Sequence, residues 1–191
     1  MLNHEEFLTG VRDVFHSDIS QFTETLTAGS GIIHLANVPW ERWQPSFVSE
    51  RAGRWNLQGQ PTKYFADDLG VSLAELGYSA TNPPIGRTVE VWQTKDQLPV
   101  ISVGRFPKEI QSAIYQEKDS TKKWEYSHLL VEEFAKQSYA RDYLGFFAPS
   151  ASGIVVRMGG LCLAANPGLQ SVERVMAMPY EEIIQLYQKI L

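Results

Sequence analysis

The chain has 191 residues, of which 43% are hydrophobic and 20% charged, and this fits one globular domain with its own core. A formal net charge of −5 argues against direct binding to nucleic acid, because surfaces that follow phosphates carry an excess of Lys and Arg. A single cysteine, Cys162, excludes an internal disulfide and fits a reducing compartment.

The first residues of the chain do not resemble a secretory signal peptide. Met1 to Phe7 contain neither a basic region nor an apolar region, and no run of about 18 apolar residues occurs in the chain. We therefore expect a soluble, cytoplasmic protein that does not bind a membrane. A secreted effector that needs no cleavable signal is the alternative.

The first part of the chain predicts helices, then a strand, then a long loop. Apolar residues recur every three or four positions over residues 3–27, which predicts one or two amphipathic helices. Residues 31–36 are a short, β-branched, Gly-bounded run, which predicts a buried strand that contains His34. Residues 37–60 hold prolines and tryptophans without periodicity, which is typical of a binding loop.

Strands and helices alternate in the rest of the chain. Residues 61–66 predict a strand that carries Tyr64, and Asp67 and Asp68 supply a cap for a helix that contains Glu75. Residues 86–94 and 98–103 predict a pair of strands with a turn at 96–97. Helices are predicted at 108–117, 122–138 and 179–190, and short strands at 145–148, 154–156, 161–164 and 171–178.

An arginine, a tyrosine and a glutamate are evenly spaced in this region. Arg54 and Tyr64 are ten positions apart, and Tyr64 and Glu75 are eleven apart. The predicted turn, strand and helix would bring a cation, an aromatic face and a carboxylate into one cleft. This combination is typical of an NAD site.

The same residues form part of a longer motif. Gly53-Arg-Trp-Asn56 with Gly59, Pro61 and Tyr64, followed by Ser72 and Glu75, resembles the RES domain, a family of bacterial toxins from toxin–antitoxin pairs. The segments that end in Pro149-Ser150 and in Asn166-Pro167 resemble later elements of that family. The resemblance covers about residues 31–170.

The resemblance implies a fold and an activity. The fold would be α+β, with an ADP-ribosyltransferase-like mixed sheet as its core and peripheral helices. Residues 1–30 would be an N-terminal helical extension, and residues 31–191 the NAD-binding domain. The activity would consume NAD as a substrate.

The residue types suit cleavage of the bond between nicotinamide and ribose. That reaction passes through an oxocarbenium-like centre, and a carboxylate stabilises its positive charge or binds the ribose 2-OH. We expect Glu75 in this role, Tyr64 against the nicotinamide ring, and Arg54 on the diphosphate. Ser150 is expected to bind the nicotinamide end, and Asn56 to order the loop or bind a ribose hydroxyl.

His34 stands where members of the family commonly carry an arginine. A neutral imidazole there could hold the ribose or the carboxamide, so His34 is a candidate substrate-binding residue. The substitution could equally weaken or alter catalysis, or His34 could be an ordinary strand histidine. No metal is expected, because His4, His16 and His128 lie at no metal-like spacing and the chain has one cysteine.

The sequence leaves the acceptor of ADP-ribose open. Water would make the protein an NAD glycohydrolase and phosphate an NAD phosphorylase, and both would deplete NAD. A protein side chain would make it a mono-ADP-ribosyltransferase. The expected partner is a cognate antitoxin or immunity protein that covers the active site. A non-catalytic module that binds NAD or a partner protein is the alternative of another class.

Overall fold

A computed structural model of the chain describes residues 2–43, 51, 53–79, 81–149, 161–165 and 172–190. Its helices there are α1 (His4–His16), α2 (Leu69–Glu75), α3 (Lys108–Tyr115), α4 (Ser120–Ala135) and α6 (Tyr180–Ile190). Its strands there are β1 (Thr23–Leu26), β2 (Gly31–Pro39), β3 (Lys63–Ala66), β4 (Arg87–Thr94), β5 (Leu98–Ser102), β6 (Gly145–Pro149), β7 (Leu161–Ala165) and β8 (Val172–Pro179).

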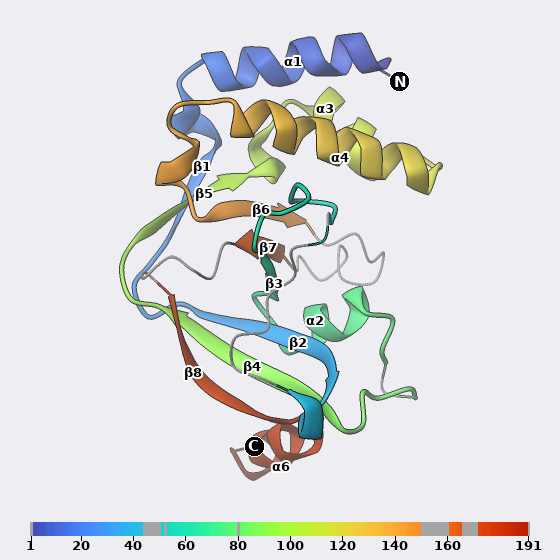
Figure 1. The fold of residues 1–191 in the computed structure, drawn as a ribbon, viewed down its shortest axis with the longest axis vertical. Helices are drawn as coiled ribbons and strands as arrows, with labels where there is room; N and C mark the ends of the chain where they lie inside the picture. The colour runs from blue at the N-terminus through green and yellow to red at the C-terminus, as the bar shows by residue number, and fades with distance from the viewer. Residues whose placement is uncertain are drawn as a thin grey trace.

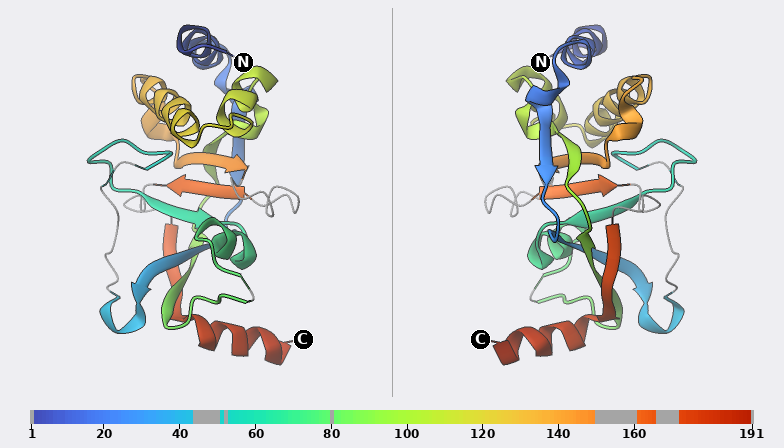
Figure 2. Two further views of the ribbon diagram at one scale, coloured as in Figure 1. Left: turned by 90° about the vertical axis from the view of Figure 1, so that its right-hand side faces the viewer. Right: turned by 90° about the vertical axis from the view of Figure 1, so that its left-hand side faces the viewer.

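The strands form one mixed sheet in the order β1-β5-β6-β7-β3-β2-β4-β8. Neighbouring strands are antiparallel except β5 and β6, which run parallel. Helices α1, α3 and α4 cover one end of the sheet, α6 lies at the other end, and α2 lies beside β2 and β3 (Figure 1). Side views show the same division (Figure 2). The predicted α+β fold with a mixed sheet and peripheral helices is confirmed.

Strands β4 and β5 are present as predicted but do not pair with each other. β4 pairs with β2 and β8, whereas β5 pairs with β1 and β6. The predicted turn at 96–97 therefore does not close a hairpin. Both strands are buried along most of their length, so each needs partners along both edges, which a local hairpin alone does not supply.

The Thr94 side chain shows why the chain continues instead of turning back. Its hydroxyl donates to the Thr27 carbonyl at 2.6 Å and accepts from the Ser30 amide at 3.1 Å. The β1–β2 connection is thereby fastened to the β4–β5 connection. Each connection holds a short turn or bend and carries the chain from one part of the sheet to the other (Figure 1).

The N-terminal segment contains α1, a short 3-10 helix at Ile19–Phe22 and the strand β1, so the prediction of one or two helices over residues 3–27 is confirmed up to residue 22 and is wrong for residues 23–26. Asn3 caps α1, since its side chain accepts from the Glu6 amide at 3.0 Å and the Glu6 carboxylate accepts from the Asn3 amide at 2.9 Å. Residues 23–26 matched a helical period, but this segment is short and rich in threonine, which favours a strand. It pairs with β5 and forms β1.

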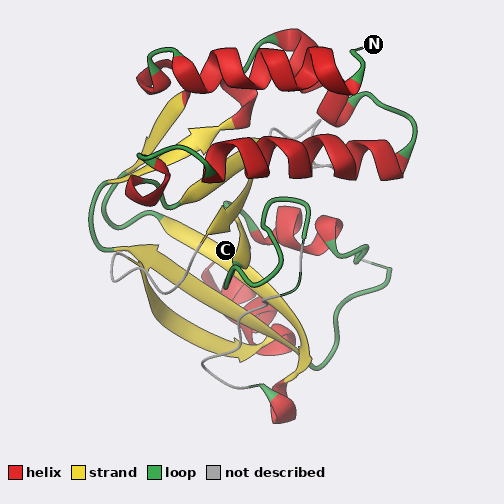
Figure 3. Ribbon diagram, turned by 45° about the horizontal axis from the view of Figure 1, so that its top comes forward, coloured by secondary structure: helices red, strands yellow, loops and turns green. Residues whose placement is uncertain are grey.

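Helix α1 belongs to the main core. Phe7 and Val11 are 0% exposed and pack in one cluster with side chains of α3 and α4. Figure 3 shows the two long helices, the first marked by N, on the same side of the strands. The boundary between residues 30 and 31 stays a prediction, but residues before it supply both a strand and core side chains.

The other predicted elements agree with the structure within a few residues, as β2, β3, α2, α3, α4, β6, β7, β8 and α6. The strand predicted at 154–156 lies outside the described residues. Within the described part of the chain, none of the helices combines the length and apolar character needed to cross a bilayer.

Candidate functional site

A pocket of about 160 Å³ lies where strands β2 and β3 separate. The two strands share a single register pair, Ile33 with Ala66, and residues next to this pair on both strands line the pocket. The loop before β3, helix α2 and the end of β6 complete the wall. The lining residues are His34, Leu35, Arg54, Trp55, Tyr64, Phe65, Ala66, Ser72, Glu75, Leu76 and Pro149. Four of the residues expected at the site, His34, Arg54, Tyr64 and Glu75, thus lie around one cavity.

His34 joins the two strands at the opening. Its Nδ1 lies 2.7 Å from the main-chain carbonyl oxygen of Tyr64. A carbonyl oxygen only accepts hydrogen bonds, so Nδ1 carries the hydrogen. Burial, and then the nearby Lys63 ammonium, lowers the pKa of His34, although the bond to Tyr64 opposes this. At neutral pH the ring is therefore uncharged, with a lone pair on Nε2.

The hydroxyl of Tyr64 is bonded to the loop that precedes its strand. It donates to Asn56 Oδ1 at 2.8 Å and accepts from the Trp55 amide at 2.8 Å. Burial raises the pKa of Tyr64 to about 12, so the hydroxyl stays protonated. The ring, rather than the hydroxyl, is the part of Tyr64 best placed to meet a ligand.

Gly53 makes this arrangement possible. A Cβ atom at position 53 would lie 2.5 Å from the Tyr64 hydroxyl oxygen and 2.6 Å from Asn56 Oδ1, closer than real Cβ atoms approach other atoms. A glycine is therefore required where the loop passes over the tyrosine.

Asn56 lies behind Tyr64 and is not among the residues that line the pocket. It is 2% exposed, and its Nδ2 donates to the carbonyls of Arg51 at 2.9 Å and Leu57 at 3.1 Å. Of the two roles expected for Asn56, this placement suits ordering of the loop and does not suit direct contact with a ribose.

Arg54 is a fixed cation at the wall of the pocket. Its Nε donates to Ser127 Oγ at 3.0 Å and its Nη2 to the Ile114 carbonyl at 2.9 Å. The guanidinium carbon lies 5.4 Å from the centre of the Trp55 ring and 5.3 Å from that of Tyr115. Helices α3 and α4 thus hold the positive charge in place before any ligand arrives.

Glu75 is the last residue of α2 and is exposed at the pocket. Asp68 caps the start of the helix, because its Oδ1 accepts from the amides of Gly70 at 2.6 Å and Val71 at 3.3 Å. This cap fixes the start of a short helix, and its last turn carries the carboxylate.

Sequence reasoning missed part of the wall. Ser72, which belongs to the motif but was expected in no role, lies one helical turn before Glu75 and also lines the pocket. Its three-residue spacing from Glu75 was a usable signal. The apolar wall of Leu35, Phe65 and Ala66 carried no signal that separates it from ordinary strand core. Ser150 lies outside the described residues, as does Asn166; Pro149, which precedes Ser150, lines the pocket.

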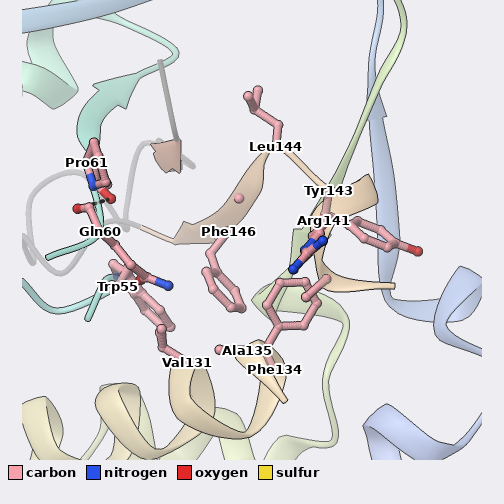
Figure 4. A pocket seen from close by; sticks show the side chains of 13 residues that line it. Trp55, Gln60, Pro61, Val131, Phe134, Ala135, Arg141, Tyr143, Leu144 and Phe146 are labelled. Atoms are coloured by element: carbon pink, nitrogen blue, oxygen red, sulfur yellow. Dashed lines mark hydrogen bonds between the residues drawn. The ribbon is translucent and has the colours of Figure 1, made fainter. Parts of the chain in front are cut away.

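A second and larger pocket, of about 390 Å³, lies between the loop that precedes β3 and the end of α4 (Figure 4). Trp55 lines both pockets, but His34, Arg54, Tyr64 and Glu75 do not line the second one. The wall of the larger pocket includes Phe134, Tyr143 and Phe146. We place the candidate site in the smaller pocket because those four expected residues line it together. Among the described residues, no group of three or more His, Cys, Asp or Glu side chains is placed to hold a metal ion.

Comparison with known proteins points to one family. The family model of the RES domain matches residues 34–184. One chain in the crystal structure of the M. tuberculosis MbcT-MbcA toxin-antitoxin complex shares the fold, with a TM-score of 0.53 over 96% of this chain and 95% of that chain, at 14% sequence identity. No curated protein sequence matches the chain. The residues that line the candidate site all fall within the matched range.

Proposed function

The chain belongs to the RES domain family, and from this premise we propose that it is an enzyme that cleaves NAD between nicotinamide and ribose. The observation that carries the proposal is the pocket that His34, Arg54, Tyr64 and Glu75 line together. It brings an acceptor nitrogen, a cation, an aromatic ring and a carboxylate within reach of one ligand.

Glu75 is the proposed catalytic residue. As nicotinamide leaves, positive charge builds up on the ribose ring, and a carboxylate near that ring stabilises it. A hydrogen bond from the ribose 2-OH to the same carboxylate would strengthen as the charge develops. The exposed position of Glu75 at the pocket leaves room for a ribose that reaches out of the cavity.

The inner part of the pocket suits the nicotinamide end. Its volume of about 160 Å³ is below the roughly 300–1,000 Å³ of sites that enclose a whole ligand, so it would take one end of the dinucleotide. The Tyr64 ring offers a face for stacking, and the lone pair on His34 Nε2 can accept from the carboxamide N–H. Arg54 supplies positive charge for the diphosphate.

The biological role is proposed on the same basis. Transfer of ADP-ribose to water or phosphate would deplete NAD, which makes the protein a toxin. A cognate antitoxin that covers the pocket is the proposed partner, which fits the shared fold with a chain of a toxin–antitoxin complex. The choice between water, phosphate and a protein side chain as acceptor is left to experiment.

Release of nicotinamide from NAD by the purified protein, followed by chromatography, tests the proposal. We expect turnover that falls at least about 100-fold in Glu75→Gln, the scale of removing one preorganised electrostatic group. Glu132→Gln, which changes an exposed glutamate of α4, is the matched control and should keep full activity.

The products identify the acceptor. Reactions with and without phosphate separate ADP-ribose from its 1-phosphate, and labelled NAD with candidate proteins reveals transfer to a side chain. NAD that binds without release of nicotinamide would contradict the proposed enzyme and favour a binding module. Turnover that is the same in Glu75→Gln would remove Glu75 from the mechanism.

A further inference from the structure

A buried ion pair lies beside the candidate site. Glu90 of β4 is 0% exposed and Lys63 of β3 is 4% exposed, and Lys63 Nζ lies 2.6 Å from Glu90 Oε2. The indole nitrogens of Trp43 and Trp92 also donate to the carboxylate, at 3.0 and 3.2 Å. Stability alone explains such a pair poorly, because apolar side chains of similar volume often stabilise a protein as well.

The ion pair crosses the strand that carries His34. Strand β2 lies between β3 and β4 in the sheet, so Lys63 reaches Glu90 over β2, a span of about 10 Å at the usual strand spacing. His34 and Glu90 are register partners and therefore project from the same face of the sheet. Ala36, two residues further along β2, is on that face as well and leaves room for the lysine.

The charges around His34 nearly cancel. Lys63 and Glu90 neutralise each other, and Arg174 of β8 lies 3.9 Å from the Glu90 carboxylate. Arg54 and Glu75 line the pocket from the other elements. A proton on His34 would add an uncompensated positive charge to this partly buried place. Without Lys63, by contrast, the Glu90 carboxylate would attract that proton.

We propose that Lys63 is a positioning residue that neutralises Glu90 and so holds His34 uncharged, with its hydrogen on Nδ1 and the Nε2 lone pair turned toward a ligand. The Tyr64 carbonyl selects the tautomer, and the ion pair sets the charge. Burial, and then Lys63, lowers the pKa of His34, whereas the bond to Tyr64 and the Glu90 carboxylate raise it. The contact between Nε2 and a ligand rests on the proposed function, whereas the protonation state and tautomer of the imidazole do not.

Removal of the Lys63 charge and removal of the Glu90 charge should shift the titration midpoint of His34 in opposite directions. A purely structural role of the pair would not produce opposite shifts. Lys63→Met leaves the Glu90 carboxylate beside His34, so the titration midpoint of His34 should rise by about one pH unit or more. Glu90→Gln leaves the Lys63 ammonium, so the midpoint should fall. NMR of imidazole nitrogens in labelled protein measures both, with the His34 signals assigned from a His34→Gln variant.

Controls keep the result interpretable. The NMR signals of His4, His16 and His128 serve as internal references in all variants. The double variant Lys63→Met with Glu90→Gln removes both charges, so it leaves no unpaired buried charge and should fold even where a single variant fails to fold. Its His34 titration midpoint should lie near that of the wild type. In every variant that folds, the acid limb of nicotinamide release should move in the same direction as the midpoint.

The outcomes separate the two proposals. Midpoints that shift in opposite directions support the positioning role even if no nicotinamide is released, in which case only the proposed function fails. Nicotinamide release with a His34 midpoint that is unchanged, or that moves in the same direction in both single variants, would overturn the positioning role. A double variant with a midpoint far from the wild type would overturn it as well.

Discussion

The Nδ1 atom of His34 lies 2.7 Å from the carbonyl oxygen of Tyr64, so a side chain joins β2 to β3 where their backbone pairing ends. Both residues also line the candidate pocket. The opening in the sheet and the proposed NAD site are therefore the same structural feature. Changes to the contacts that hold this opening should alter stability and activity in separable ways.

Tyr64→Phe should cost about 1–3 kcal/mol of unfolding free energy. The change keeps the ring but leaves the Trp55 amide and Asn56 Oδ1 without the hydroxyl that they bond. Urea unfolding measures the loss, and Tyr180→Phe at the start of α6 should cost less. Nicotinamide release should change less than in Glu75→Gln, because the proposed stacking face remains. A variant as stable as the wild type would show that the hydroxyl contributes little.

Gly53→Ala should disturb the site more than the addition of a single methyl group suggests. The new Cβ would lie 2.5 Å from the Tyr64 hydroxyl, so either the tyrosine or the loop must move. We expect a loss of about 1–3 kcal/mol in stability and reduced nicotinamide release. Gly31→Ala is the matched control, since a Cβ there meets nothing within 4 Å. Equal behaviour of the two variants would contradict the close packing over Tyr64.

The partly buried imidazole of His34 should make stability depend on pH. Its pKa is lowered from the ordinary value of 6.5 in the folded protein, so below that pH the unfolded chain binds a proton that the folded chain does not. Stability should fall with decreasing pH below about 6.5, by at most about 1.4 kcal/mol per pH unit from this residue. Above about pH 7.5 the residue should have no effect.

Urea unfolding between pH 5 and 8 tests this dependence. The His34→Gln variant should lose part of the slope below pH 6.5, because it no longer has an imidazole to protonate in the unfolded chain. A slope that is unchanged in this variant would mean that other groups cause the acid sensitivity.

Phe7→Ala should show that the N-terminal helix belongs to the main core. Phe7 is 0% exposed and packs against Tyr126 of α4, with ring centres 4.6 Å apart. Truncation of a buried phenylalanine costs about 3–5 kcal/mol. Thr9→Ala on the exposed side of the same helix is the control. A cost below 1 kcal/mol at Phe7, measured by urea unfolding, would instead fit a separate extension.

The local elements around the site could be read from the sequence. The β-branched run of β2, the Asp68 cap of α2 and the spacing of Arg54, Tyr64 and Glu75 are local signals, because propensity, capping and periodicity act over a few residues. These local signals pointed to Arg54, Tyr64 and Glu75, and the resemblance of the longer motifs to the RES domain added His34; the structure places all four around one pocket. The family to which the chain belongs was suggested by those motifs.

Only the tertiary structure decided how these elements meet. Strands β4 and β5 look like a hairpin in the sequence, but Thr94 ties their connection to the one between β1 and β2, a contact between residues far apart in the chain. The placement of Asn56 behind Tyr64 and the Lys63–Glu90 pair across β2 likewise depend on strand order. Strand order comes from pairing and burial over the whole sheet, which no local pattern specifies.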